Sequence, residues 1–143
     1  MKRRDEVKKE FVRQWLAKAE GNLRASRHLL DGGPGFAAAA AFHAQQAAEK
    51  SLKSVLVWHQ VEFTKTRDIG AILELLARVE GELVGRLADA NVLTPYAARY
   101  RYPGEVPEPT ISEAGHAADI AETVFREVVL RLASELHPVR TEE

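Results

Sequence analysis

The sequence has 143 residues, of which 45% are hydrophobic and 29% charged, and this balance is typical of one folded domain. The net charge of -1 argues against a broadly basic nucleic-acid-binding surface but leaves room for a local basic patch. No cysteine is present, so disulfides and thiolate chemistry are excluded. Without a secretory signal or a membrane-length apolar run, the sequence predicts a cytoplasmic protein that does not enter a membrane.

The first predicted helix ends at residue 30. Seven residues, mostly apolar, recur at steps of three or four and so share one helix face: Val7, Phe11, Trp15, Ala19, Leu23, Ser26 and Leu30. The sequence DGGPG at 31–35 ends the helix, because Pro34 cannot continue it. A second helix is expected over about 36–60, since its first half is rich in alanine, the best helix former.

The segment 69–90 has a leucine-rich helical pattern, and Thr66 or Asp68 is suited to cap its start. Gly81 and Gly85 weaken the pattern, so a break or bend is expected near Gly81. A short helical segment, PYAARY, is expected to start at Pro95, with Thr94 as its N-cap.

The last predicted helix covers about 111–136, after a proline-rich loop at 103–109. Thr110 and Glu113 have the spacing of a capping box. One stripe of this helix is small or apolar: Ala114, Ala118, Ala121, Phe125, Val128 and Leu132. The predicted fold is all-α, a single-domain up-and-down bundle of four long helices plus one or two short ones. The domain is expected to fill residues 1–143, with an ordered core of about 5–137.

Polar side chains interrupt the alanine-rich second helix. His43, Gln46, Lys50 and Lys53 fit one row of the helix surface, and Gln45 and Glu49 fit a neighbouring row that Leu52 and Leu56 continue. A buried carboxylate in that row needs a partner, for which an arginine or lysine of another helix is the natural candidate. The alternative is a solvated face with ordinary pairs one turn apart.

A second cluster, ARYRYPGE, covers residues 98–105 and combines arginines with tyrosines. Arginine offers a donor fork that matches phosphate or carboxylate, and tyrosine offers a face on which a base can stack. The alternative is a helix end whose tyrosines cover the core and whose arginines pair with acidic neighbours. No histidine pair has metal spacing, and no phosphate loop is present, so neither a metal nor another cofactor is predicted.

These two clusters resemble the HEPN domain family of prokaryotes. The matching segments are FHAQQAAEKSLKSVL at 42–56, TRDIGAILELL at 66–76 and ARYRYPG at 98–104. The resemblance implies a helical bundle and a homodimer. It also implies either a small nucleotidyltransferase partner in a two-gene, toxin–antitoxin-type module, or RNA cleavage by a toxin.

The sequence departs from the family in two places. Relatives carry a Thr-His-Asp-like trio where this chain has Thr66, Arg67 and Asp68. Ribonuclease members carry an arginine followed four to six residues later by a histidine, and no such histidine follows Arg101. The pair Arg131 and His137 has that spacing, but six residues of helix place the two side chains on different faces. The sequence therefore predicts a protein that is not an enzyme.

Three hypotheses remain. In the first, the protein binds a nucleotide or nucleic acid through seven residues, namely Gln46, Glu49, Lys50, Lys53, Arg99, Arg101 and Tyr102. In it the arginines contact phosphate, a tyrosine stacks on a base, and the residues of the second helix add charge and orient the site. In the second, a metal-independent ribonuclease toxin uses Glu49, Arg101 and Tyr102. In the third, the same residues form only an ion-pair network that fixes a dimer, and the alanine run 37–41 would allow close helix contact.

Overall fold

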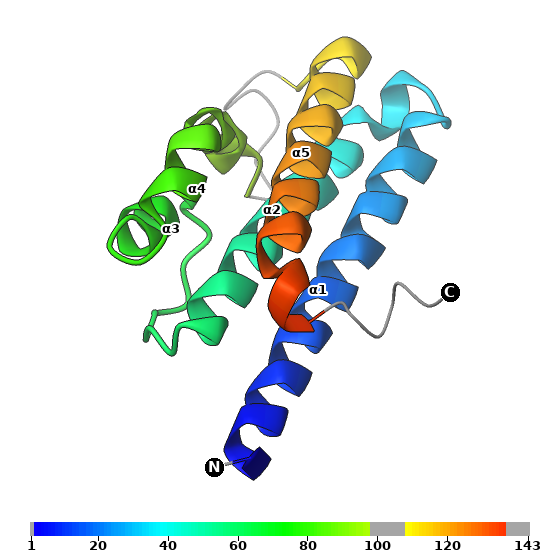
Figure 1. Cartoon of the computed structure of the whole chain (residues 1–143). Coiled ribbons are helices and arrows are strands. Elements are labelled where there is room, and N and C mark those ends of the chain that lie inside the picture. Colours follow the sequence, from blue (N-terminus) through cyan, green and yellow to red (C-terminus); the bar gives the residue numbers. More distant parts are fainter. Residues whose placement is uncertain (1, 98–107, 137–143) are drawn as a thin grey trace.

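The computed structural model describes residues 2–97 and 108–136. Three long helices form the body of the fold, which are α1 (Lys2–Leu30), α2 (Ala37–Trp58) and α5 (Ile111–Leu136). The short helices are α3 (Ile69–Leu76), α4 (Gly81–Arg86) and two 3₁₀ helices, η1 (Pro34–Phe36) and η2 (Ala88–Ala97). The all-α, single-domain prediction is confirmed. Figure 1 shows α3 and α4 lying to one side of the three long helices.

The ends of several helices follow the local sequence signals. Helix α3 begins after Asp68, whose side chain accepts a hydrogen bond from the backbone N–H of Ala71. Helix α5 begins with the expected capping box: the Thr110 hydroxyl accepts from the N–H of Glu113, and the Glu113 carboxylate accepts from the N–H of Thr110. These reciprocal bonds satisfy donors that the first turn of a helix leaves unpaired.

The segment expected to be a fourth long helix is divided. Helix α3 ends at Leu76, and α4 begins only at Gly81, so the break falls where the glycine predicted it. The short helix after it begins at Ala88 rather than at Pro95. Thr94 does not act as the expected N-cap, because its hydroxyl accepts from the N–H of Ile69 and donates to the side chain of Asn91. It thereby joins η2 to α3.

Helix α2 lies at the centre of the bundle and packs against α1, α3, α5 and η2. Its alanines Ala37, Ala40 and Ala41 are fully or almost fully buried within the chain. These three alanines therefore serve close packing inside the monomer, whereas Ala38 of the same run is exposed and Ala39 is half-buried. A hydrogen bond of 2.8 Å from the Ser26 hydroxyl of α1 to the Ala40 carbonyl fixes how closely the two helices approach.

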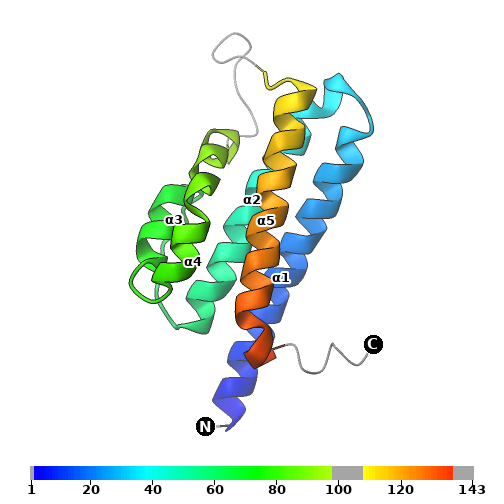
Figure 2. The same ribbon diagram turned by 45° about the horizontal axis from the view of Figure 1, so that its top comes forward.

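Helix α1 extends beyond the core at its N-terminal end, as Figures 1 and 2 both show. The predicted apolar face holds for Ala19, Leu23 and Ser26, which are buried. It does not hold for Val7 and Phe11, which are 47% and 50% exposed. The core contacts of that half of the helix come instead from Val12 and Leu16. No helix among residues 2–97 and 108–136 is both long and apolar enough to cross a bilayer.

Candidate functional site

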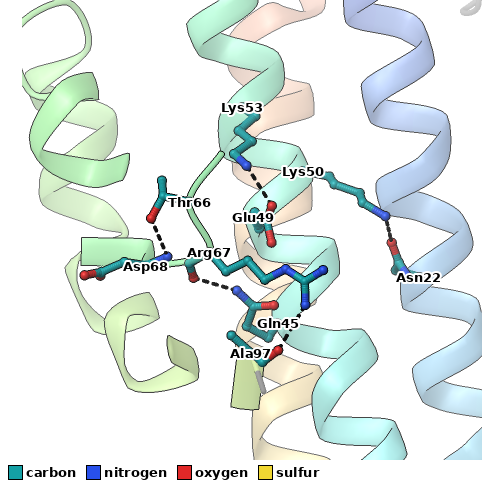
Figure 3. A network of polar contacts seen from close by, with 9 residues as sticks. All are labelled: Asn22, Gln45, Glu49, Lys50, Lys53, Thr66, Arg67, Asp68 and Ala97. Atoms are coloured by element: carbon teal, nitrogen blue, oxygen red, sulfur yellow. Dashed lines mark hydrogen bonds and ion pairs between the residues drawn. The ribbon is translucent and has the colours of Figure 1, made fainter. Parts of the chain in front are cut away.

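A buried polar row runs along α2 in place of the solvated face that sequence reasoning left open. Gln45, Glu49 and Lys53 lie on successive turns and are 0%, 7% and 4% exposed. The Lys53 ammonium donates to Oε2 of Glu49 over 2.7 Å (Figure 3). The partner of the buried carboxylate thus comes from the same helix, one turn away, and not from a neighbouring helix.

Two acceptor atoms in this row have no hydrogen-bond partner among the described residues. They are Oε1 of Gln45 and Oε1 of Glu49, and both are inaccessible to solvent. A buried acceptor left without a donor costs about 1–3 kcal/mol, so such atoms are rare in folded proteins. The row therefore has an unused capacity to accept hydrogen bonds beside its ion pair.

Arg67, in the connection between α2 and α3, contacts the polar row at Gln45. Its backbone carbonyl accepts a hydrogen bond of 2.8 Å from the side-chain amide of Gln45, and its guanidinium donates to the Ala97 carbonyl at 3.1 Å. The guanidinium also lies 5.8 Å from the centre of the Phe42 ring. Figure 3 shows this side chain reaching along α2 below Glu49. Arginine at the position where relatives carry histidine is therefore part of the site and brings a permanent charge to it.

Lys50 points to the other side of α2, toward α1. Its ammonium donates to Oδ1 of Asn22 over 2.9 Å, and Nδ2 of Asn22 lies 3.0 Å from Nδ1 of His43 (Figure 3 shows the first contact). Burial lowers the pKa of Lys50, the negative charge of Glu49 raises it, and the positive charges of Lys18, Arg67 and Lys53 lower it again. The net pKa is lowered, chiefly because burial disfavours the charged ammonium, and the neighbouring cations add to that effect.

Aromatic rings border the same region. The Lys53 ammonium lies 5.5 Å from the centre of the Phe63 ring and 6.0 Å from that of Trp15, within the usual range of cation–π attraction. Trp15 and Phe63 meet edge to face with 6.1 Å between their centres. The Lys53 ammonium is therefore held by ring faces as well as by Glu49.

The structure brings together three of the seven residues proposed from the sequence, namely Glu49, Lys50 and Lys53. Gln46, a fourth, is half-buried on α2, and its side chain makes no hydrogen bond with another described residue. Arg99, Arg101 and Tyr102 lie outside the described residues. Sequence reasoning did not include three site residues: Asn22, Gln45 and Arg67. Arg67 was noted in the sequence only as a member of the trio 66–68 that departs from the family pattern, whereas no local pattern indicated Asn22.

A second polar cluster joins three elements at the other end of α2. Oε2 of Glu80 lies 2.7 Å from Nε2 of His59, and Oε1 accepts from Nε of Arg131 at 2.8 Å. Burial raises the pKa of Glu80, but the hydrogen bonds and charges of these two partners outweigh it and lower the pKa. Arg131, the arginine of the Arg131–His137 pair, is thus engaged with a carboxylate, and His137 lies outside the described residues. Among the described residues, no group of three or more histidine, aspartate or glutamate side chains is placed to hold a metal ion.

Comparison with known proteins identifies the family. The model of the HEPN domain family matches residues 12–132, so the chain belongs to this family. The crystal structure of an archaeal HEPN homologue superimposes with a TM-score of 0.63 and 24% identity, covering 85% of this chain and 97% of the other. At that identity the likeness supports the fold alone. No curated protein sequence matches the chain significantly.

Proposed function

We propose that this HEPN domain protein binds a nucleotide or nucleic acid beside the polar row of α2. The observation that carries the proposal is the local charge: three cations, Lys18, Lys53 and Arg67, act on Lys50 together with the carboxylate of Glu49. A phosphate group is the common ligand that suits such an excess of cations. The chain as a whole has a net charge of -1, so the excess belongs to this site and not to the surface in general.

The remaining chemistry of the site suits the base of the same ligand. Oε1 of Gln45 and Oε1 of Glu49 accept from no donor in residues 2–97 and 108–136, and nucleobases carry N–H groups that donate. Both atoms are buried, so a ligand reaches them only if a covering group moves aside. Arg99, Arg101 and Tyr102 follow Ala97, whose carbonyl Arg67 already binds, and in this proposal they complete the site with phosphate contacts and a stacking face.

Calorimetric titration with ATP, GTP and short RNAs tests this proposal. We expect heat from at least one of them, and a loss of about tenfold in affinity for Arg67→Ala, because one charge-assisted contact to phosphate is removed. The matched control is Arg86→Ala: this arginine is also exposed, and it binds Glu127 at 3.0 Å from α4. A folded wild-type protein that binds none of these ligands would contradict the proposal, as would an equal loss in both variants.

We further propose that the protein acts as a homodimer with a small nucleotidyltransferase partner, in a toxin–antitoxin-type module. Family membership supports this part of the proposal. Light scattering after size exclusion measures the dimer, and co-expression with a nucleotidyltransferase encoded by the neighbouring gene measures the complex. A monomer that co-purifies with no such partner would contradict it. Transcript cleavage on induction, lost in Arg101→Ala, would favour the ribonuclease instead.

A further inference from the structure

The projecting turns of α1 continue the candidate site as a face of cations and aromatic rings. Residues on this face recur at steps of three or four and therefore lie in one row: Arg4, Val7, Lys8, Phe11, Trp15, Lys18 and Asn22. We call this row the α1 stripe. Its charged members are all basic. It ends at Asn22, the residue that binds Lys50, so it leads directly into the candidate site.

Positive charge is also concentrated in the N-terminal part of the chain, where the α1 stripe begins. Residues 1–13 contain six lysines and arginines and three acidic residues, a net charge of +3, whereas the remaining 130 residues have a net charge of -4. By helical rotation the acidic residues Asp5, Glu6 and Glu10 lie on other faces of α1. The stripe is therefore a local positive surface on a near-neutral protein.

The rings of the stripe are placed to contact a ligand. Phe11 is half exposed although it is a large apolar side chain, and it makes no ring contact with another described residue. Trp15, one turn further, is half-buried against Phe63. The Lys8 ammonium lies 4.1 Å from the centre of the Trp58 ring, which fixes one cation beside the row. An isolated exposed phenylalanine is unremarkable, but one in a row of basic side chains, of which Lys8 is held on the Trp58 ring, is the pattern of a stacking platform.

From these observations we propose that the ligand is a single-stranded nucleic acid, and that the α1 stripe holds the nucleotides adjacent to the one in the candidate site. This inference rests on the proposed function and specifies its ligand. Arg4 to Lys18 spans 14 residues, or about 21 Å of helix, which is room for about three or four nucleotides of a strand. In the bound state Phe11 stacks on a base while Arg4, Lys8 and Lys18 contact phosphates.

Two other occupants fit the stripe less well. A second copy of the chain in two-fold contact would bring the same basic row against itself, and like charges in contact repel. An aliphatic groove of another protein would suit Val7 and Phe11, yet it would have to accommodate the cations that flank them. A polyanion with flat bases satisfies both the charges and the rings.

Fluorescence anisotropy with labelled oligoadenylate RNAs of one, two, four and eight nucleotides tests the proposal. Affinity of the wild-type protein is expected to rise with length up to about four nucleotides beyond the first and to fall with added salt. Phe11→Ala is expected to weaken binding of the eight-nucleotide RNA about tenfold and to leave binding of the mononucleotide unchanged. The matched control is Phe36→Ala, since Phe36 in η1 is 48% exposed and lies away from the stripe.

Each result separates the inference from the proposed function. If the mononucleotide binds but affinity does not grow with length, or if Phe11→Ala and Phe36→Ala behave alike, the stripe proposal is overturned and the proposed function stands. If no RNA of any length binds, the stripe proposal is overturned, and the proposed function fails as well when ATP and GTP also give no heat in the calorimeter. If Phe11→Ala changes only the size of the particle in light scattering, the stripe is a protein contact and the proposal is overturned.

Discussion

Two buried carboxylates, Glu49 on α2 and Glu80 at the start of α4, are bonded in opposite ways. Glu80 is 6% exposed and uses both oxygens, bonding His59 from the end of α2 and Arg131 from α5. Glu49 is 7% exposed and bonds Lys53 of its own helix, while its second oxygen has no partner among the described residues. The first carboxylate joins separate elements and is saturated. Within the described part of the chain, the second bonds only its own helix and leaves one acceptor without a donor, which is expected of a binding group rather than a structural one.

The largest effect is expected when only one member of the Glu49–Lys53 pair is removed. Glu49→Leu leaves the Lys53 ammonium buried without its carboxylate and should lower the free energy of unfolding by about 3 kcal/mol. The double variant Glu49→Leu, Lys53→Met removes both charges and should recover stability to within about 1 kcal/mol of the wild type. Urea denaturation measures both.

The same double variant then separates structure from binding. If Glu49 serves a ligand, the restored protein should fold but lose nucleotide binding in the calorimeter. A double variant that stays as unstable as the single one would show that the pair does more for the fold than its position within one helix indicates. Unchanged binding would remove Glu49 from the site.

Replacement of Glu80 should lower the free energy of unfolding by less than Glu49→Leu does. A second substitution on one helix should not restore this loss, because the partners of Glu80 lie on two different elements. Glu80→Ala is expected to lower the free energy of unfolding by about 2 kcal/mol, because His59 and Arg131 are partly exposed and can bind water instead. Nucleotide binding should persist at temperatures where the variant is folded. A loss of binding in the folded variant would contradict the assignment of ligand binding to the Glu49 row and of a structural role to Glu80.

Acid should destabilise the protein in part through Glu80. Because the pKa of Glu80 is lower in the folded protein than in the unfolded chain, its contribution to stability is complete above the unfolded pKa. That contribution is lost as the pH falls through the folded pKa. Thermal melting of the wild type at pH 7 and pH 4 should therefore show a larger drop than melting of Glu80→Gln. Equal drops would mean that Glu80 does not carry this part of the acid sensitivity.

The smallest effect is expected at a surface pair that resembles neither cluster. Arg27 of α1 bonds Asp119 and Glu122 of α5, and all three side chains are largely exposed. Water and salt screen such pairs, so Arg27→Ala should change the free energy of unfolding by about 0.5 kcal/mol or less. A much larger change in urea denaturation would show that charge pairs between α1 and α5 position these helices.

The sequence was sufficient for the parts of the fold that depend on local signals. Long periodic segments defined α1, α2 and α5, and the spacing of Thr110 and Glu113 located the start of the last helix. Burial of the α2 row was not predictable in the same way. Glu49 and Lys53 stand four residues apart, a spacing that an exposed pair and a buried pair share.

The site depends on contacts that no local pattern encodes. Asn22 and Arg67 reach the row from two other parts of the chain, 28 residues before Lys50 and 22 residues after Gln45. The exposure of Phe11 was also missed, because periodicity shows that residues share a face but not where the neighbouring helices end. The roles of Arg99, Arg101 and Tyr102 remain predictions.

The central position of α2 has a consequence for local motion. A helix enclosed by four others can exchange its amide protons only when much of the bundle opens, so α2 should hold its protons longest in deuterated solvent. The first turns of α1, which extend past the core, should exchange fastest. A ligand that rests on both would therefore contact the slowest- and the fastest-exchanging backbone among the described helices at once. Its arrival should be visible as a slowing of exchange at Val7 and Phe11 long before any change is seen in α2.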